Sequence, residues 1–206
     1  MKKLFLEVNN LMKDETGKTV KKRIKEFQEF KNHPEEKWFS ELCFCLLTAN
    51  TSAEMGLRVQ KKVSAEKMLS LTEKKLANEL KKAGSRFHNR RANFICEARE
   101  YSDIKTIINS LPEKEKRNFL VKNIKGIGLK EASHFLRNTG FLDYAIIDKH
   151  VLNVALENGL IKEKKLNEKN YFLLERKLEK LANRLSISLG ELDLFLWFIK
   201  TGKILK

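Results

Sequence analysis

The sequence is poor in the residues that crosslink, kink or interrupt a chain. Among its 206 residues, proline occurs twice and glycine nine times. Cysteine occurs three times, at Cys43, Cys45 and Cys96. An odd number of cysteines without a Cys-x-x-Cys spacing fits neither a disulfide framework nor a zinc or iron–sulfur site. We expect buried thiols in a reducing compartment, and a chain long enough to fold without a disulfide or a metal.

Long apolar runs are also missing. The apolar part of residues 1–6 is too short for a secretory signal. No later stretch reaches the roughly 18 apolar residues that a membrane span requires. We therefore expect a soluble, intracellular protein with no membrane partner.

Acidic residues are outnumbered by basic ones. Lys and Arg number 42 and Asp and Glu number 27, so the formal net charge is +15. An excess of this size on a small protein predicts a polyanionic partner, and nucleic acid is the first candidate. The alternative is that a lysine-rich surface serves only to keep the protein in solution.

Apolar residues recur at helical spacing along most of the chain, and no segment alternates with the period of a strand. The pattern predicts an all-α protein of about ten short helices. Three of them are expected after Gly140, at residues 148–158, 167–184 and 189–201. A charged helical region of about 30 residues comes first and ends at the break expected at His33-Pro34.

The most informative stretch runs from Phe119 to Gly140. It reads as two amphipathic helices that flank a tight Gly126-Ile127-Gly128 turn. Glycines on either side of one apolar residue let the backbone approach another chain closely, while Ile127 enters the core. The amides that open the second helix then point outward and form an anion site suited to a DNA phosphate.

This segment resembles the helix-hairpin-helix of the base-excision DNA glycosylase superfamily, in which Gly-Ile-Gly-Leu-Lys precedes a catalytic aspartate by about twenty residues. Lys130 and Asp148 match that pattern, since 148 − 130 = 18. The resemblance implies an all-α, two-lobed fold with a DNA-binding cleft between the lobes. It implies catalytic roles for Lys130 and Asp148, and contacts of Gly126, Gly128 and Lys125 with the DNA backbone.

We expect one lobe to be a central bundle over residues 31–131 that ends in the hairpin. The second lobe would combine residues 1–30 with residues 132–206.

The chemistry of the two residues supports this assignment. A lysine in the first turn of a helix feels the positive end of the helix dipole, and partial burial adds desolvation, so both effects are expected to lower its pKa. The neutral amine could then attack C1′ of a deoxyribose and form a Schiff base, which permits β-elimination. Asp148 would stabilise the positive charge that develops at C1′ or orient the amine.

Each residue also has a simpler interpretation. Lys130 could be one surface lysine among many, and Asp148 could be only the N-cap of its helix. The two together, with the hairpin before them, favour catalysis.

Other segments resemble the compact archaeal-type 8-oxoguanine glycosylases, the second Ogg family, from about residue 35 to the C-terminus. These segments are residues 41–51, 84–92 and 197–206. The resemblance implies a bifunctional glycosylase and AP lyase that excises 8-oxoguanine from double-stranded DNA. It implies no required cofactor and no iron–sulfur cluster, although hairpin carbonyls in the superfamily can hold a monovalent cation. We expect a monomer, cytoplasmic and associated with the nucleoid.

Three residues are candidates for recognition of a flipped base. The family uses a C-terminal lysine, which is Lys206 here, and stacks the base between side chains, for which Phe87 and Trp197 are candidates. Trp197 could instead pack in the core, and charged chain ends are usually solvated. We also expect basic side chains to follow the phosphates, namely Arg86, Arg90 and Arg91, with solvated surface charges as the alternative.

The sequence alone leaves three other functions open. The same fold and nucleophile could act on another lesion, such as an oxidised pyrimidine. A helix-hairpin-helix module could grip the DNA backbone without chemistry. An all-α interaction protein with a basic surface would show little affinity for DNA at moderate salt.

Overall fold

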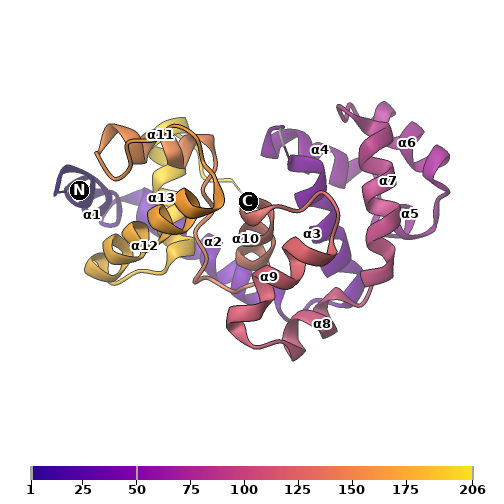
Figure 1. Ribbon diagram of the computed structural model, residues 1–206, viewed down its shortest axis with the longest axis horizontal. Helices are drawn as coiled ribbons and strands as arrows, with labels where there is room; N and C mark the ends of the chain where they lie inside the picture. Colours follow the sequence, from indigo (N-terminus) through magenta and orange to yellow (C-terminus); the bar gives the residue numbers. More distant parts are fainter. Residues whose placement is uncertain (1, 50, 206) are drawn as a thin grey trace. The chain divides into compact units, whose positions relative to one another are not determined.

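The computed structural model describes residues 2–49 and 51–205. Within them, the chain forms thirteen α-helices and one 3-10 helix and no strand, which confirms the all-α prediction (Figure 1). The expected number of about ten helices was too low, because several short polar segments form helices of their own. None of the described helices is both long and apolar enough to cross a bilayer. The helices are α1 (Lys2–Leu11), α2 (Glu15–Phe30), α3 (Glu35–Thr48), α4 (Ala53–Lys62), α5 (Ala65–Ser70), α6 (Glu73–Lys82), α7 (His88–Ala98), η1 (Arg99–Tyr101), α8 (Ile104–Ser110), α9 (Glu113–Asn123), α10 (Leu129–Asn138), α11 (Lys149–Glu157), α12 (Glu168–Leu185) and α13 (Leu189–Thr201).

The described residues divide into two compact units. Residues 2–31 and 136–205 form one, which we call the terminal unit, and residues 32–135 form the other, the central unit. The first boundary falls between α2 and α3, where Pro34 occupies the N-cap position of α3. Proline lacks an amide hydrogen and disfavours a helical residue before it, so it separates the two helices.

The central unit is built around α3. Every residue of α3 from Trp38 to Thr48 is buried, as expected for a helix surrounded by others. It packs against α4, α5, α7 and α8, while α6 packs along α7. The ring of Trp38 meets that of Phe135 edge to face, with 6.0 Å between the centroids. This core supports the hairpin.

The terminal unit is built around α13, which contacts α1, α2, α11 and α12. A capping box holds its N-terminus: the Ser188 hydroxyl accepts from the Glu191 amide, and the Glu191 carboxylate accepts from the Ser188 amide. Asp193 forms a buried ion pair with Arg137. A buried charge left without its partner is costly, so this pair ties α13 to Arg137 within the unit.

Candidate active site and DNA-binding hairpin

The hairpin expected from the sequence is present in the central unit. Helices α9 and α10 flank residues 124–128, and Ile127 between the glycines is buried. The Ile127 amide donates to the Ile124 carbonyl at 3.1 Å, and the Ala132 amide donates to the Gly128 carbonyl at 2.9 Å. Amides that precede Ala132 in the first turn have no helical acceptor, so they can receive an anion.

The two glycines of the turn differ in what the fold requires of them. Gly126 has a φ of 92°, and a Cβ there would lie 2.5 Å from Cδ2 of Phe94. Gly128 has no positive φ, and the nearest atom to a Cβ built on it is Oε2 of Glu131, at 3.4 Å. The fold therefore accounts for glycine at position 126, while position 128 has room for a methyl group.

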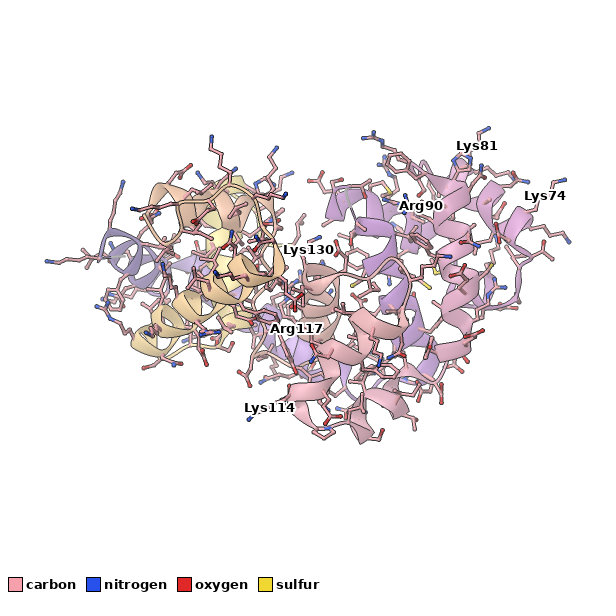
Figure 2. All side chains as sticks on the ribbon, viewed as in Figure 1. Lys74, Lys81, Arg90, Lys114, Arg117 and Lys130 are labelled. Carbon is pink, nitrogen blue, oxygen red and sulfur yellow. The ribbon has the colours of Figure 1, made fainter. Side chains whose placement is uncertain are left out.

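Lys130 lies in the first turn of α10, directly after the hairpin turn (Figure 2). Its side chain is 25% exposed, and its Nζ is 3.4 Å from Oε1 of Glu131, whose side chain is 16% exposed. The side chain is thus partly buried and partly accessible. Sequence reasoning did not single out Glu131, the neighbouring residue whose carboxylate holds the amine.

Asp148 is the N-cap of α11 in the terminal unit. One oxygen, Oδ1, accepts from the amides of His150 and Val151, both at 2.8 Å. The structure records no bond to Oδ2 among the described residues. The capping role weighed from the sequence is therefore real, and it also fixes the carboxylate so that its second oxygen is available to a ligand.

Trp197 lies on α13 and is only partly buried, so it does not belong to the unit's core as its neighbours Leu194 and Phe195 do. Its ring meets that of His150 edge to face, with 5.8 Å between centroids. Because Asp148 caps the helix that carries His150, the terminal unit brings Trp197 and Asp148 onto adjoining helices. This contact of His150 was not expected from the sequence.

Phe87 is the most exposed large apolar side chain of the described residues, at 58%. It occupies the N-cap position of α7 in the left-handed conformation, with a φ of 55°. The guanidinium carbon of Arg86 lies 5.3 Å from the centre of its ring. Left-handed backbone is strained for a bulky residue, and strain of this kind concentrates at functional positions.

Arg91 is buried, with 4% exposure, whereas Arg86 and Arg90 are exposed. The expectation that Arg91 follows the DNA phosphates is therefore wrong. Its guanidinium donates to the Ala49 carbonyl at 2.8 Å and to the Thr51 hydroxyl at 3.2 Å. It also donates to the Ser85 hydroxyl at 3.4 Å. Burial, with help from Arg86, lowers its pKa to about 10. Arg91 therefore ties the turn before Phe87 to the end of α3.

Lys125, Gly126, Gly128, Lys130 and Phe87 all belong to the central unit. Asp148 and Trp197 belong to the terminal unit. Lys206, the other candidate for base recognition, lies outside the described residues.

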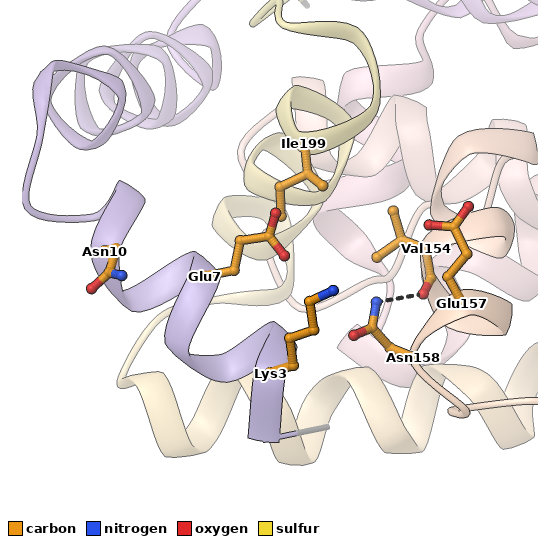
Figure 3. Close-up of a pocket in the computed structure, with 7 residues that line it drawn as sticks. All are labelled: Lys3, Glu7, Asn10, Val154, Glu157, Asn158 and Ile199. Atoms are coloured by element: carbon orange, nitrogen blue, oxygen red, sulfur yellow. Dashed lines mark hydrogen bonds between the residues drawn. The ribbon is translucent and has the colours of Figure 1, made fainter.

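A pocket of about 410 Å³ lies in the terminal unit between α1, α11 and α13 (Figure 3). It is lined by Lys3, Glu7, Asn10, Val154, Glu157, Asn158 and Ile199. These residues of α11 are at its C-terminal end, whereas Asp148 caps its N-terminus. None of the lining residues is a candidate site residue, so the pocket takes no part in the reaction proposed below.

No group of three or more His, Cys, Asp or Glu side chains suited to a metal ion occurs in the described part of the chain. Cys43 and Cys45 are buried, and Cys96 is partly buried.

The comparisons with known proteins agree on one family. Residues 20–187 match the family model described as 8-oxoguanine DNA glycosylase. The chain is 46% identical over 206 residues to an 8-oxoguanine DNA glycosylase/AP lyase of Methanocaldococcus jannaschii, covering 98% of this chain and 99% of that protein. The chain belongs to the 8-oxoguanine DNA glycosylase family.

Solved structures support the same assignment. The structure resembles that of the M. jannaschii 8-oxoguanine glycosylase/lyase in complex with a 15-mer DNA containing 8-oxoguanine, with a TM-score of 0.95 at 46% identity, over 98% of this chain and 99% of that one. It also resembles the 8-oxoguanine DNA glycosylase of Thermotoga maritima, with a TM-score of 0.91 at 42% identity, over 100% of this chain and 99% of that one. Both matches cover residues of the central unit and of the terminal unit.

Proposed function

We propose that this protein is a bifunctional DNA glycosylase and AP lyase that excises 8-oxoguanine from duplex DNA. The observation that carries the proposal is the position of the Lys130 amine, partly buried in the first turn of α10 directly after an anion-binding hairpin turn, in a member of this family. Membership alone would allow a protein that has lost its nucleophile. The retained lysine argues for chemistry as well as binding.

The proposed reaction uses the neutral amine of Lys130. Nζ attacks C1′ of the damaged nucleotide, the bond from C1′ to the base breaks, and the base leaves with a proton. The bond from C1′ to O4′ then breaks, O4′ takes up a proton, and the open sugar is left joined to Lys130 as an imine. The imine acidifies the 2′ protons, so loss of one of them expels the 3′ phosphate by β-elimination. The chemistry requires no metal or organic cofactor, and a monovalent cation at the hairpin carbonyls would act only on DNA binding.

Asp148 is proposed to stabilise the positive charge at C1′ through Oδ2. Because Oδ1 is held by two backbone amides, the carboxylate is already oriented when the substrate arrives. A charged group that needs no reorganisation stabilises a transition state more effectively than a mobile one.

The other candidate residues are assigned to binding. Gly126, Gly128 and Lys125 would contact the DNA backbone, since they form the hairpin turn. Phe87 and Trp197 are the proposed aromatic surfaces for an extruded base, and Lys206 the proposed polar contact with it. Extrusion costs a few kcal/mol of stacking, which such surfaces restore.

The test of the proposed substrate is strand cleavage on matched duplexes. One duplex carries a single 8-oxoguanine opposite cytosine, a second carries an oxidised pyrimidine, and a third is undamaged. We expect cleavage of the first alone. Cleavage of the pyrimidine duplex instead would retain the mechanism and replace the lesion, whereas binding to all three without cleavage would reduce the protein to a DNA-binding module.

A further inference from the structure

One face of α7 is turned toward the hairpin. Arg90, Phe94 and Glu97 are spaced i, i+4 and i+7 along α7, which places them on the same side of the helix. The ring of Phe94 lies directly against the turn, since a Cβ on Gly126 would come within 2.5 Å of it. The charged residues before and after Phe94 on this face therefore flank the hairpin turn.

Two cations meet at the Phe94 ring. The guanidinium carbon of Arg90 is 5.2 Å from the ring centre, and Nζ of Lys125, the residue before Gly126, is 5.9 Å from it. Cations within about 6 Å of an aromatic face are attracted to it. Arg90 and Lys125 are both exposed and both lie against the same ring, and like charges gathered at one ring repel each other. An anion placed between them would relieve that repulsion.

Glu97 already supplies one negative charge to this group. Its Oε1 is 2.9 Å from Nζ of Lys125, and the two side chains are 42% and 61% exposed, respectively. An ion pair this exposed contributes little to stability, so another anion can replace the carboxylate. Arg90 has no such carboxylate partner among the described residues. The group of three keeps one net positive charge.

We propose that Arg90 and Lys125 form a second phosphate-binding point beside the hairpin turn, at which Glu97 competes with the DNA phosphate for Lys125. The proposal rests on the proposed function, in that the ligand is the backbone of duplex DNA. Backbone binding carries no information about the lesion. The competition from Glu97 therefore weakens binding to undamaged DNA, on which a repair enzyme would otherwise be held.

The test compares charge-neutralising variants by the salt dependence of binding to an undamaged duplex. The variants are Arg90→Gln, Lys125→Gln, Glu97→Gln and the control Lys81→Gln, in which the replaced lysine is exposed on α6 (Figure 2). Each phosphate contact contributes about 0.9 to the slope of log affinity against log salt. When the salt concentration is raised fourfold, a variant that lacks one phosphate contact should therefore lose about 3.5-fold less affinity than the wild type does.

We expect Arg90→Gln to flatten the slope by about 0.9. Glu97→Gln should steepen the slope and tighten binding at low salt, and Lys125→Gln should have a larger effect in the Glu97→Gln background than alone. Lys81→Gln should change the slope less than Arg90→Gln does.

Equal effects of Arg90→Gln and Lys81→Gln would overturn the second binding point. An unchanged or weaker affinity in Glu97→Gln would overturn the competition. Strand cleavage by the wild-type protein on the 8-oxoguanine duplex is measured alongside. If cleavage fails while the slopes change as expected, the second phosphate-binding point stands and the catalytic assignment falls. If the duplex is cleaved while the slopes stay unchanged, the catalytic assignment stands and the second phosphate-binding point falls.

Discussion

Alanine at each of the two hairpin glycines should separate folding from DNA binding. At Gly126 the φ of 92° costs a residue with a side chain roughly 1–3 kcal/mol. In addition, the new methyl group would lie 2.5 and 2.8 Å from two carbons of the Phe94 ring, which must move. With a loss of about 2 kcal/mol and a urea m-value of about 2 kcal/mol/M, the unfolding midpoint should fall by about 1 M.

Gly128→Ala should leave stability unchanged or slightly raised. Its methyl group would meet only Oε2 of Glu131, at an ordinary contact distance of 3.4 Å, and alanine restricts the unfolded chain more than glycine does. Affinity for duplex DNA should nevertheless fall, because the methyl group occupies space at the turn through which a phosphate reaches the amides. Loss of one hydrogen bond to a charged group, about 1.5–3 kcal/mol, corresponds to roughly a 10- to 150-fold weaker affinity.

Urea unfolding, monitored by circular dichroism, measures the change in stability. Fluorescence anisotropy with an undamaged duplex measures the change in DNA affinity. Gly128→Ala that bound DNA as the wild type does would refute the assignment of the turn to the DNA backbone. A Gly126→Ala protein as stable as the wild type would show that the hairpin does not pack on Phe94 as described.

Three further predictions concern other residues. Asp148→Asn keeps a good N-cap, so it should unfold at the wild-type urea concentration while strand cleavage falls about 100-fold or more; comparable activity would mean that Asp148 only caps α11. Phe87→Asn relieves the strain of the left-handed backbone at position 87, so it should stabilise the fold by up to about 1 kcal/mol. Single-turnover excision should slow roughly tenfold because the stacking surface is lost. A destabilised variant with normal excision would contradict the stacking role. Burial raises the pKa of the Cys43 thiol, so above pH 9 the unfolded state releases a proton that the folded state keeps. Between pH 8 and pH 10, the free energy of unfolding measured in urea should therefore fall by about 1.4 kcal/mol more in the wild type than in Cys43→Ala. The same fall in both proteins would refute the prediction.

The local features of the fold could be predicted from the sequence. The hairpin turn, the start of α10 and the capping position of Asp148 follow from glycine placement, apolar periodicity and the preference of aspartate for helix starts. The break between α1 and α2 was missed, although Asp14 caps α2 by accepting from the Thr16 amide at 2.7 Å. A capping aspartate inside a charged segment has no apolar contrast to mark it.

The missed parts of the site depend on contacts between distant segments. Arg91 is buried because the end of α3 supplies carbonyl and hydroxyl acceptors about 40 residues away, which a run of basic residues does not reveal. The contact between His150 and Trp197 requires α11 to pack on α13. The face of α7 that carries Phe94 has helical spacing, but only the packed hairpin gives that spacing a functional meaning.

Borohydride trapping tests the central claim, that Lys130 is the nucleophile, most directly. Wild type and Lys130→Gln are incubated with a duplex that carries one 8-oxoguanine opposite cytosine and, in parallel, with the undamaged duplex. The account predicts a covalent protein–DNA adduct for the wild type with the lesion duplex and for no other combination. An adduct of undiminished yield with Lys130→Gln, or none with a wild-type protein that binds the lesion duplex, would contradict it.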